Sequence, residues 1–436
     1  MKEDSNQKTQ ETQEEMIFHP EIKRLNKAKI ILYTIPVLVI FGVFFGVPHI
    51  FSTKYISGGT IPIISGEKEE GKDENKFVPI YLPTPNSVKG VYMTSWVAGT
   101  DSLRKQIVKL VEDTELNTII IDIKDDTGRV SFAVEDEYLN EIGSPEVRIP
   151  DIKEFIKYLN TKGIYIIGRI SVFQDPYLIK QRPDLAVKRA SDGAVWRDRK
   201  GIGWLDAGSH EAWDYVVSIA RESYNVGFDE LNFDYIRFPS DGNMRDIYYP
   251  FSEEKVLTDP DFGKAKVLKN FFAYLDSQLE DLDMPISADL FGMTTTNKDD
   301  LNIGQVLENA LPYFDYIAPM VYPSHYPTGF NGYQNVNAYP YEIVNFSMSE
   351  AVKRIREFKE IKASTTPNAP YLSKLRTNQL RPWLQDNDYP VPYTPEMVRA
   401  QIDATYDAGL NSWMLWDAAN TYTRAALENV TLENQE

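Results

Sequence analysis

The feature that most constrains the fold is a regular alternation of short apolar runs with longer amphipathic segments between residues 90 and 416. Eight of the apolar runs have the length and composition of β-strands, and seven segments between them have the periodicity of helices. Strands that alternate with helices form parallel sheets, and eight is the strand count of a closed (β/α)8 TIM barrel. The expected strands span residues 90–94, 118–124, 165–170, 230–236, 286–291, 316–322, 380–383 and 412–416. The expected helices span residues 101–112, 152–162, 211–225, 264–282, 303–311, 349–359 and 394–408.

The main alternative is an open, doubly wound α/β sheet, in which a glycine-rich phosphate loop follows the first strand. Here the first expected strand runs into Met93, Thr94, Ser95 and Trp96, which form no such loop. We therefore predict a TIM barrel over residues 88–427, followed by a short C-terminal tail at residues 428–436.

A different pattern precedes the barrel. Residues 1–27 are polar and acidic without apolar periodicity, which predicts a disordered tail. Residues 28–51 contain an apolar run of about 18 residues, from Ile30 to Val47, which is near the length that crosses a bilayer. Basic residues crowd its N-terminal side, so the positive-inside rule predicts a single transmembrane helix with a cytoplasmic N-terminus and an extracellular barrel. No small-residue cleavage signal follows, which favours an uncleaved signal-anchor, and residues 52–87 have the composition of a linker.

Ionisable side chains occupy one face of several expected strands. Because strand side chains alternate, the apolar residues can face the helices while the polar residues face the barrel interior. The acids stand near the C-terminal strand ends, where characterised barrel enzymes carry their active sites. Buried carboxylates are costly unless paired, so the pattern indicates a catalytic cluster or a structural ion-pair network. The inward set is Asp122 and Lys124, then Glu230, Asn232 and Asp234, then Ser287 and Asp289, and the ion pairs considered are Asp122 with Lys124 and Asp234 with Arg169 or Arg237.

Aromatic residues are frequent at the same end of the predicted barrel, both in the loops and at the C-terminal ends of the strands. The loop after the third strand holds Trp204, and Tyr322 and His325 follow the sixth strand. Trp383 and Trp416 stand at the ends of the last two expected strands. Aromatic rings bury a large apolar area at low entropic cost and suit stacking on sugar faces. The set favours a carbohydrate groove over loops that pack only on one another.

Composition excludes several classes of function. The formal net charge of -18 argues against nucleic acid as a partner, since phosphates require basic patches. The absence of cysteine removes disulfides, thiolate zinc sites and cysteine nucleophiles. Only four histidines are present and none forms a metal-binding pair, which disfavours a metal-dependent polysaccharide deacetylase. We expect no cofactor and no metal, and the sequence leaves the oligomeric state open.

Several segments together resemble a bacterial glycoside-hydrolase family that was first catalogued as a domain of unknown function and is similar to the alpha-amylase-like TIM barrels. The resemblance extends from about Val88 to about Leu427. The segments are GVYMTSW (90–96), NTIIIDIKDDTG (117–128), FDELNFDYIRFP (228–239), SADLFGM (287–293), IAPMVYPSHYPTGF (317–330), LRPWLQ (380–385) and SWMLWDAANTYT (412–423). In the alpha-amylase-like barrels a nucleophilic Asp ends the fourth strand and an acid/base Glu ends the fifth. Asp234 matches the first position, whereas position 289 is Asp rather than Glu, and position 232 is Asn where those barrels have Arg.

These observations predict a membrane-anchored glycoside hydrolase that acts on a polysaccharide or cell-surface glycan through paired carboxylates. Hydrolysis needs one carboxyl that stays protonated and one that is ionised. We assign Asp234 as the nucleophile and Asp289 as the acid, with Asp122 in reserve. The predicted substrate-binding residues are Lys124, Arg169, Trp204, Asn232, Arg237, Tyr322, His325, Trp383 and Trp416. The alternative is a catalytically inactive glycan-binding or scaffold protein of the cell envelope.

Overall fold

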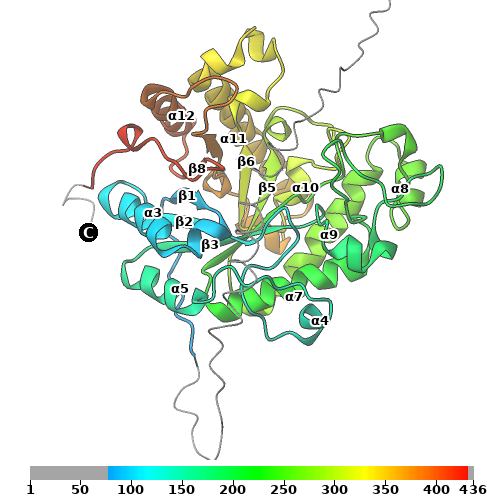
Figure 1. Cartoon of the computed structure of the whole chain (residues 1–436). Helices are drawn as coiled ribbons and strands as arrows, with labels where there is room; N and C mark the ends of the chain where they lie inside the picture. Colours follow the sequence, from blue (N-terminus) through cyan, green and yellow to red (C-terminus); the bar gives the residue numbers. More distant parts are fainter. Residues whose placement is uncertain (1–76, 431–436) are drawn as a thin grey trace, which may run out of the picture. The chain divides into compact units, whose positions relative to one another are not determined.

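The computed structural model describes residues 77–430, in which eight parallel strands close into a barrel that helices surround (Figure 1). Each strand pairs with the next along the chain, and the last pairs with the first. The predicted TIM barrel is thereby confirmed. The strands are β1 (Lys89–Met93), β2 (Thr118–Lys124), β3 (Tyr165–Ser171), β4 (Glu230–Asp234), β5 (Ile286–Phe291), β6 (Tyr316–Met320), β7 (Trp383–Gln385) and β8 (Trp413–Trp416).

The predicted helices are present, with two notable changes in length. The expected helix at residues 303–311 is reduced to the four-residue α10, and the one at 349–359 is the middle of the 26-residue α11. The main helices are α3 (Asp101–Asp113), α5 (Ile152–Thr161), α7 (His210–Val226), α9 (Gly263–Leu279), α10 (Leu307–Ala310), α11 (Pro340–Thr365) and α12 (Pro395–Asp407). Shorter helices are α2 (Ser95–Ala98), α4 (Glu137–Glu141), α6 (Leu178–Gln181) and α8 (Glu253–Thr258).

Local sequence signals explain where several elements begin and end. Ser209 caps α7 by accepting a hydrogen bond from the backbone N–H of Ala212, and Gly227 ends that helix at a φ of 106°. The seventh strand starts later than predicted because Pro382 has no N–H to donate to the ladder. Residues before that proline still lie beside β6, through a bridge between Ile317 and Leu380.

Two apolar clusters confirm which strand face points inward. Ile119, Ile121 and Phe233 belong to the large cluster between strands and helices, as their parity predicts. Ile120 and Tyr165 belong to a smaller cluster that fills the barrel interior. The interior parity of β2, β4 and β5 is therefore the one that carries Asp122, Asn232, Asp234 and Asp289, as predicted.

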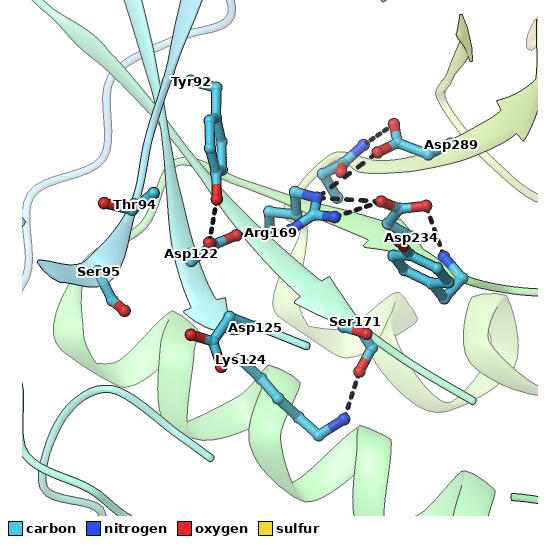
Figure 2. Close-up of polar contacts among 12 residues, drawn as sticks. Tyr92, Thr94, Ser95, Asp122, Lys124, Asp125, Arg169, Ser171, Asp234 and Asp289 are labelled. Atoms are coloured by element: carbon cyan, nitrogen blue, oxygen red, sulfur yellow. Dashed lines mark hydrogen bonds and ion pairs between the residues drawn. The ribbon is translucent and has the colours of Figure 1, made fainter. Parts of the chain in front are cut away.

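Lys124 is the exception, and the prediction that it points inward is wrong. A bulge in β2 shifts the register between Asp122 and Lys124, so Lys124 pairs with Ile170, whose side chain faces the helices. Its ammonium group lies 2.8 Å from Asp175 and 6.0 Å from the ring centre of Tyr215 on α7. Figure 2 shows the side chain directed away from Asp122, Asp234 and Asp289 and toward Ser171.

The predicted membrane span at residues 28–51 lies outside the described residues, as do the predicted tail at 1–27, most of the linker at 52–87 and most of the C-terminal tail. Within residues 77–430, no helix combines the length and the apolar character needed to cross a bilayer.

Candidate active site

A cavity of about 270 Å³ opens at the C-terminal end of the barrel strands. A larger hollow of about 540 Å³ lies beside Pro285 and Ile286, where β5 begins, and none of the predicted site residues lines it. The first cavity is therefore the candidate active site, in the place that barrel enzymes use. Its walls comprise Arg169, Asp234, Tyr235, Arg237, Asp289, Phe291, Met320, Tyr322, Ser324, His325, Trp383, Asn387, Tyr389 and Trp416.

The cavity brings together most of the residues that the sequence predicted for the site. Those at its wall are Asp234, Asp289, Arg169, Arg237, Tyr322, His325, Trp383 and Trp416. Four others do not line it: Asp122, Lys124, Trp204 and Asn232. Asp122 and Asn232 lie directly behind lining residues and support them, whereas Lys124 belongs to the separate ion pair described above.

Arg169, on β3, joins the three predicted catalytic acids (Figure 2). Its Nη1 donates to Oδ1 of Asp122 at 2.7 Å, and its Nε donates to Oδ2 of Asp234 at 3.1 Å. Nη2 donates to the same oxygen of Asp234, and Nε lies 3.9 Å from Oδ2 of Asp289. The side chains of all four residues are less than 10% exposed, so water screens these charges only weakly. Three acids thus converge on one cation.

Asp289 is held in surroundings that favour its protonated form. Burial, and then the negative charge of Asp234, raise the pKa of Asp289 well above its ordinary value. Its Oδ1 accepts hydrogen bonds from Nδ2 of Asn232 and Nε1 of Trp383, both at 2.8 Å. Oδ2 lies beyond hydrogen-bonding distance of Arg169, and no other group within residues 77–430 donates a hydrogen bond to it. A proton on Asp289 is therefore best accommodated at Oδ2.

Asp234 has the opposite surroundings. Two N–H groups of Arg169 donate to Oδ2, and the backbone N–H of Tyr235 donates to Oδ1 at 2.6 Å. Charge-assisted donors of this kind stabilise a carboxylate anion. Tyr235 reaches this position with a φ of 52°, a left-handed conformation that costs energy for a bulky residue. The turn therefore places a donor on Asp234 and the Tyr235 ring at the cavity wall.

Asp122 supports Arg169 from behind. It accepts one hydrogen bond from Arg169 and a short one from the hydroxyl of Tyr92. Burial raises the pKa of Asp122 to about 6. The Tyr92 ring stacks on Trp416 with centres 4.1 Å apart, so the same residue that holds Asp122 also fixes an aromatic wall of the cavity.

The predicted aromatic residues divide into wall-forming rings and buried supports. Trp416 packs edge-on against Trp383, and His325 packs between Tyr322, at 5.0 Å, and Phe291, at 5.9 Å. Burial, followed by the charge of Arg237, lowers the pKa of His325, which favours the neutral imidazole. Trp383 is almost fully buried and serves Asp289 as a hydrogen-bond donor.

Trp204 was predicted to contact substrate, but the structure does not place it at the cavity wall. It is 2% exposed, its indole N–H donates to Asp198 at 3.0 Å, and its ring lies under the guanidinium of Arg237 at 4.8 Å. The loop after β3 folds back through a bridge between Gln174 and Trp204, which turns the ring inward.

Some wall residues were missed by the sequence predictions. Phe291 has the parity of Asp289 on the same strand, so the alternation rule could have identified it. Tyr235 has the wrong parity and reaches the cavity only through its left-handed backbone, which nothing in the sequence indicates. Tyr389, in the loop after β7, is 64% exposed and offers an open ring at the rim.

Within residues 77–430, no three Asp, Glu or His side chains are grouped as metal ligands.

Two solved structures are similar to this chain. A crystal structure of a hypothetical protein from Ruminiclostridium thermocellum is 33% identical over a match that covers 46% of this chain and 96% of that one, with a TM-score of 0.41. The glycoside hydrolase domain of PgaB (BpsB) from Bordetella bronchiseptica is 14% identical, covers 76% of this chain and 94% of that one, and has a TM-score of 0.53. The second likeness shows the same fold. No curated protein matches the chain.

The family model described as "Putative glycosyl hydrolase domain" matches residues 90–422. This match covers β1 from its second residue, the other seven strands in full and all the cavity residues named above. The resemblance inferred from the sequence motifs is therefore confirmed, and the chain belongs to this glycosyl hydrolase family.

Proposed function

We propose that the barrel hydrolyses O-glycosidic bonds in a polysaccharide or cell-surface glycan. One observation carries the proposal: Asp234 and Asp289 line one cavity from neighbouring strands, Asp289 in surroundings that favour its protonated form and Asp234 with two charge-assisted donors from Arg169. Glycoside hydrolysis requires this asymmetry, because one carboxyl must donate a proton while the other acts as nucleophile or base.

Asp289 is the proposed general acid. In the first step its Oδ2 proton passes to the glycosidic oxygen as the bond between that oxygen and the anomeric carbon breaks. Asp234 attacks the anomeric carbon with the carboxylate that Arg169 holds in place, and a covalent glycosyl-enzyme forms. In the second step a water, deprotonated by Asp289, replaces Asp234 and releases the sugar.

The spacing of the two acids favours this retaining course. Oδ2 of Asp234 and Oδ2 of Asp289 lie 3.1 and 3.9 Å from the same nitrogen of Arg169, so they are at most about 7 Å apart. Inverting enzymes separate their carboxyls by roughly 6.5–9.5 Å to admit a water, and retaining enzymes by about 5 Å. The upper limit of about 7 Å that Arg169 sets on the distance between the two acids excludes most of the distances found in inverting enzymes.

Arg169 also takes the place of an arginine that the alpha-amylase-like barrels have and that this chain lacks at the matching position. The alpha-amylase-like barrels have an Arg two residues before the nucleophile, and this chain has Asn232 there. The guanidinium from β3 reaches the nucleophile position from the neighbouring strand instead. Asn232 contributes by orienting the acid, Asp289.

The alternative function is a catalytically inactive, glycan-binding protein of the cell envelope. It is favoured by the fact that one arginine contacts all three acids, as in a structural ion-pair network. For either function we propose that residues 28–51 anchor the chain in the cell membrane with the barrel outside. The apolar run and the basic residues before it support this placement.

The test is a screen of the purified full-length chain against bacterial surface glycans and common polysaccharides, with Asp234→Asn and Asp289→Asn beside the parent. Loss of the nucleophile should lower kcat by several powers of ten, while binding survives because the aromatic wall is untouched. Asp281→Asn is the matched control, since Asp281 pairs with Arg221 on the outer surface. Equal binding by all proteins with no cleavage would establish the scaffold alternative. Cleavage that persists in Asp234→Asn would show that the nucleophile is another residue.

A further inference from the structure

Arg237 is a cation at the cavity wall whose charge is not matched. Within residues 77–430 its hydrogen bonds run only from Nη1, to the backbone oxygen of Phe238 and to Oγ of Ser240, both at 3.2 Å. Arg237 is half-buried and contacts no carboxylate among the described residues, whereas each of the four arginines that are buried there pairs with one. Those pairs are Arg148 with Asp125, Arg169 with Asp122 and Asp234, Arg354 with Glu308, and Arg381 with Glu230.

The acids that act on the charge of Arg237 are Asp234, Asp241 and Asp198, and all three already accept hydrogen bonds from other groups, Asp234 from Arg169. Oδ2 of Asp198 accepts the indole N–H of Trp204, and Oδ1 of Asp241 accepts the backbone N–H of Arg199. Burial lowers the pKa of Arg237, and the negative charges of Tyr235, Asp234, Asp241 and Asp198 would offset the effect only in part. An arginine remains charged under such conditions. The Arg237 guanidinium can therefore still bind an anionic group.

Rings on two sides hold the Arg237 guanidinium in place. Its carbon lies 4.8 Å from the ring centre of Trp204 and 5.3 Å from that of Tyr235. With Nη1 bonded to the protein, Nε and Nη2 remain as donors without a partner among the described residues. Two N–H donors that are already held in one plane can bind two oxygens of a carboxylate, sulfate or phosphate, and little conformational entropy is lost on binding.

A basic hairpin tip lies beside the same wall. The loop after β3 contains an antiparallel bridge between Arg197 and Gly203, and its tip exposes Arg197, Arg199 and Lys200. Asp198 of this tip bonds to Trp204, the ring beneath Arg237, so the tip is tied to the cavity wall. Three exposed cations in four residues depart from the acidic character of the chain, whose net charge is -18.

We propose that the glycan bound by this barrel is anionic. A carboxylate, sulfate or phosphate on the sugar inside the cavity binds the free edge of Arg237, and charges farther along the glycan bind the hairpin tip. The proposal rests on the hydrolase function proposed above, because it names the substrate class of that site. The acids of the site do not oppose such a ligand strongly, since Arg169 contacts Asp234 and the surroundings of Asp289 favour its neutral form.

Matched pairs of glycans test the proposal on the full-length chain. The pairs are oligogalacturonate with its methyl ester, dextran sulfate with dextran, and phosphomannan with mannan, so the preferred pair identifies the anionic group. Binding is measured by titration calorimetry and cleavage by the appearance of reducing ends. We expect a charged member to bind more tightly than its uncharged partner. Arg237→Gln should reduce that preference by about 10- to 100-fold, the usual weight of a charge-assisted hydrogen-bond pair.

Two further variants separate this effect from loss of folding or of net charge. Arg237→Lys keeps the charge but loses the two coplanar N–H donors, so it should retain part of the preference. Arg221→Gln removes a paired arginine from the outer surface and should leave the preference at the parent value.

The outcomes distinguish this proposal from the hydrolase function. Cleavage of neutral glycans as readily as charged ones, with no change of preference in Arg237→Gln, overturns the anionic substrate and leaves the hydrolase intact. Binding of charged glycans that depends on Arg237, without cleavage, supports the anionic ligand and refutes the hydrolase. Absence of both binding and cleavage for every pair overturns the anionic substrate.

Discussion

Replacing Arg169 by methionine is the sharpest test of how the site is built. The substitution keeps most of the side-chain volume and removes the only guanidinium within reach of Asp122, Asp234 and Asp289 in the described part of the chain. Removing one partner of a buried ion pair leaves an uncompensated charge and costs about 3–5 kcal/mol. Because Arg169 bonds directly to two acids, we expect a loss in the upper part of that range at pH 7.5.

The loss should depend on pH in a direction that the structure fixes. Without Arg169, the cation that lowers the pKa of Asp122 is lost, so the folded-state pKa of Asp122 rises further above the unfolded value of about 3.9. Between those two values the folded state binds protons that the unfolded state has released, so stability falls as pH rises through this window. At pH 4.5 the variant should therefore recover much of the stability that it lacks at pH 7.5.

Urea unfolding of parent and variant at both pH values measures this difference. Arg381→Met is the matched control, because Arg381 is equally buried but pairs with a single acid, Glu230, and does not line the cavity. It should cost stability while leaving glycan binding at the parent level. A loss below about 1 kcal/mol for Arg169→Met, or a loss that is the same at both pH values, would refute the electrostatic account.

Three further outcomes are expected. Because burial and then the charge of Asp234 raise the pKa of Asp289, the alkaline limb of kcat/KM should lie above the ordinary carboxyl range, and Asp289→Asn should abolish that limb and impair substrates with poor leaving groups most. Tyr389→Ala should weaken glycan binding by about 10-fold with little change in kcat, as measured by titration, since its exposed ring lies at the rim rather than beside the acids. Protease added to intact spheroplasts should remove the barrel and spare the N-terminal tail, and a protected barrel would refute the predicted orientation.

The periodicity of the sequence was sufficient to predict the barrel and the inward face of its strands. The bounds of β2 and β5 agree with the prediction to the residue, because in both strands one parity is wholly apolar and the other carries the polar residues. β7 could not be placed correctly, since Pro382 interrupts the strand and the residues before it pair only through a bridge. Helix α10 begins only at Leu307, because residues 301–304 form a turn in which Leu301, Asn302 and Gly304 have positive φ angles.

The site was less predictable because its details depend on backbone irregularities and on neighbouring strands. The bulge at Lys124 and the left-handed φ of Tyr235 each reverse the direction that simple alternation gives. The sequence left open whether Asp234 would pair with Arg169 or Arg237. Register decides the question, since Arg169 pairs with Asn232 on β4 and its long side chain extends to the next inward residue, Asp234.

Charge balance distinguishes the two ends of the barrel interior. Toward the N-terminal end, Glu230 meets Arg381 at 2.7 Å, one anion to one cation, as a structural pair requires. At the cavity, three acids share Arg169, so full ionisation would leave an excess of buried negative charge. Arg237 stands at the same wall but forms no hydrogen bond to these acids, so a retained proton relieves the excess, and the surroundings of Asp289 provide the place for it. A purely structural network gains nothing from such an imbalance, whereas an enzyme that must hold one protonated and one ionised carboxyl side by side depends on it.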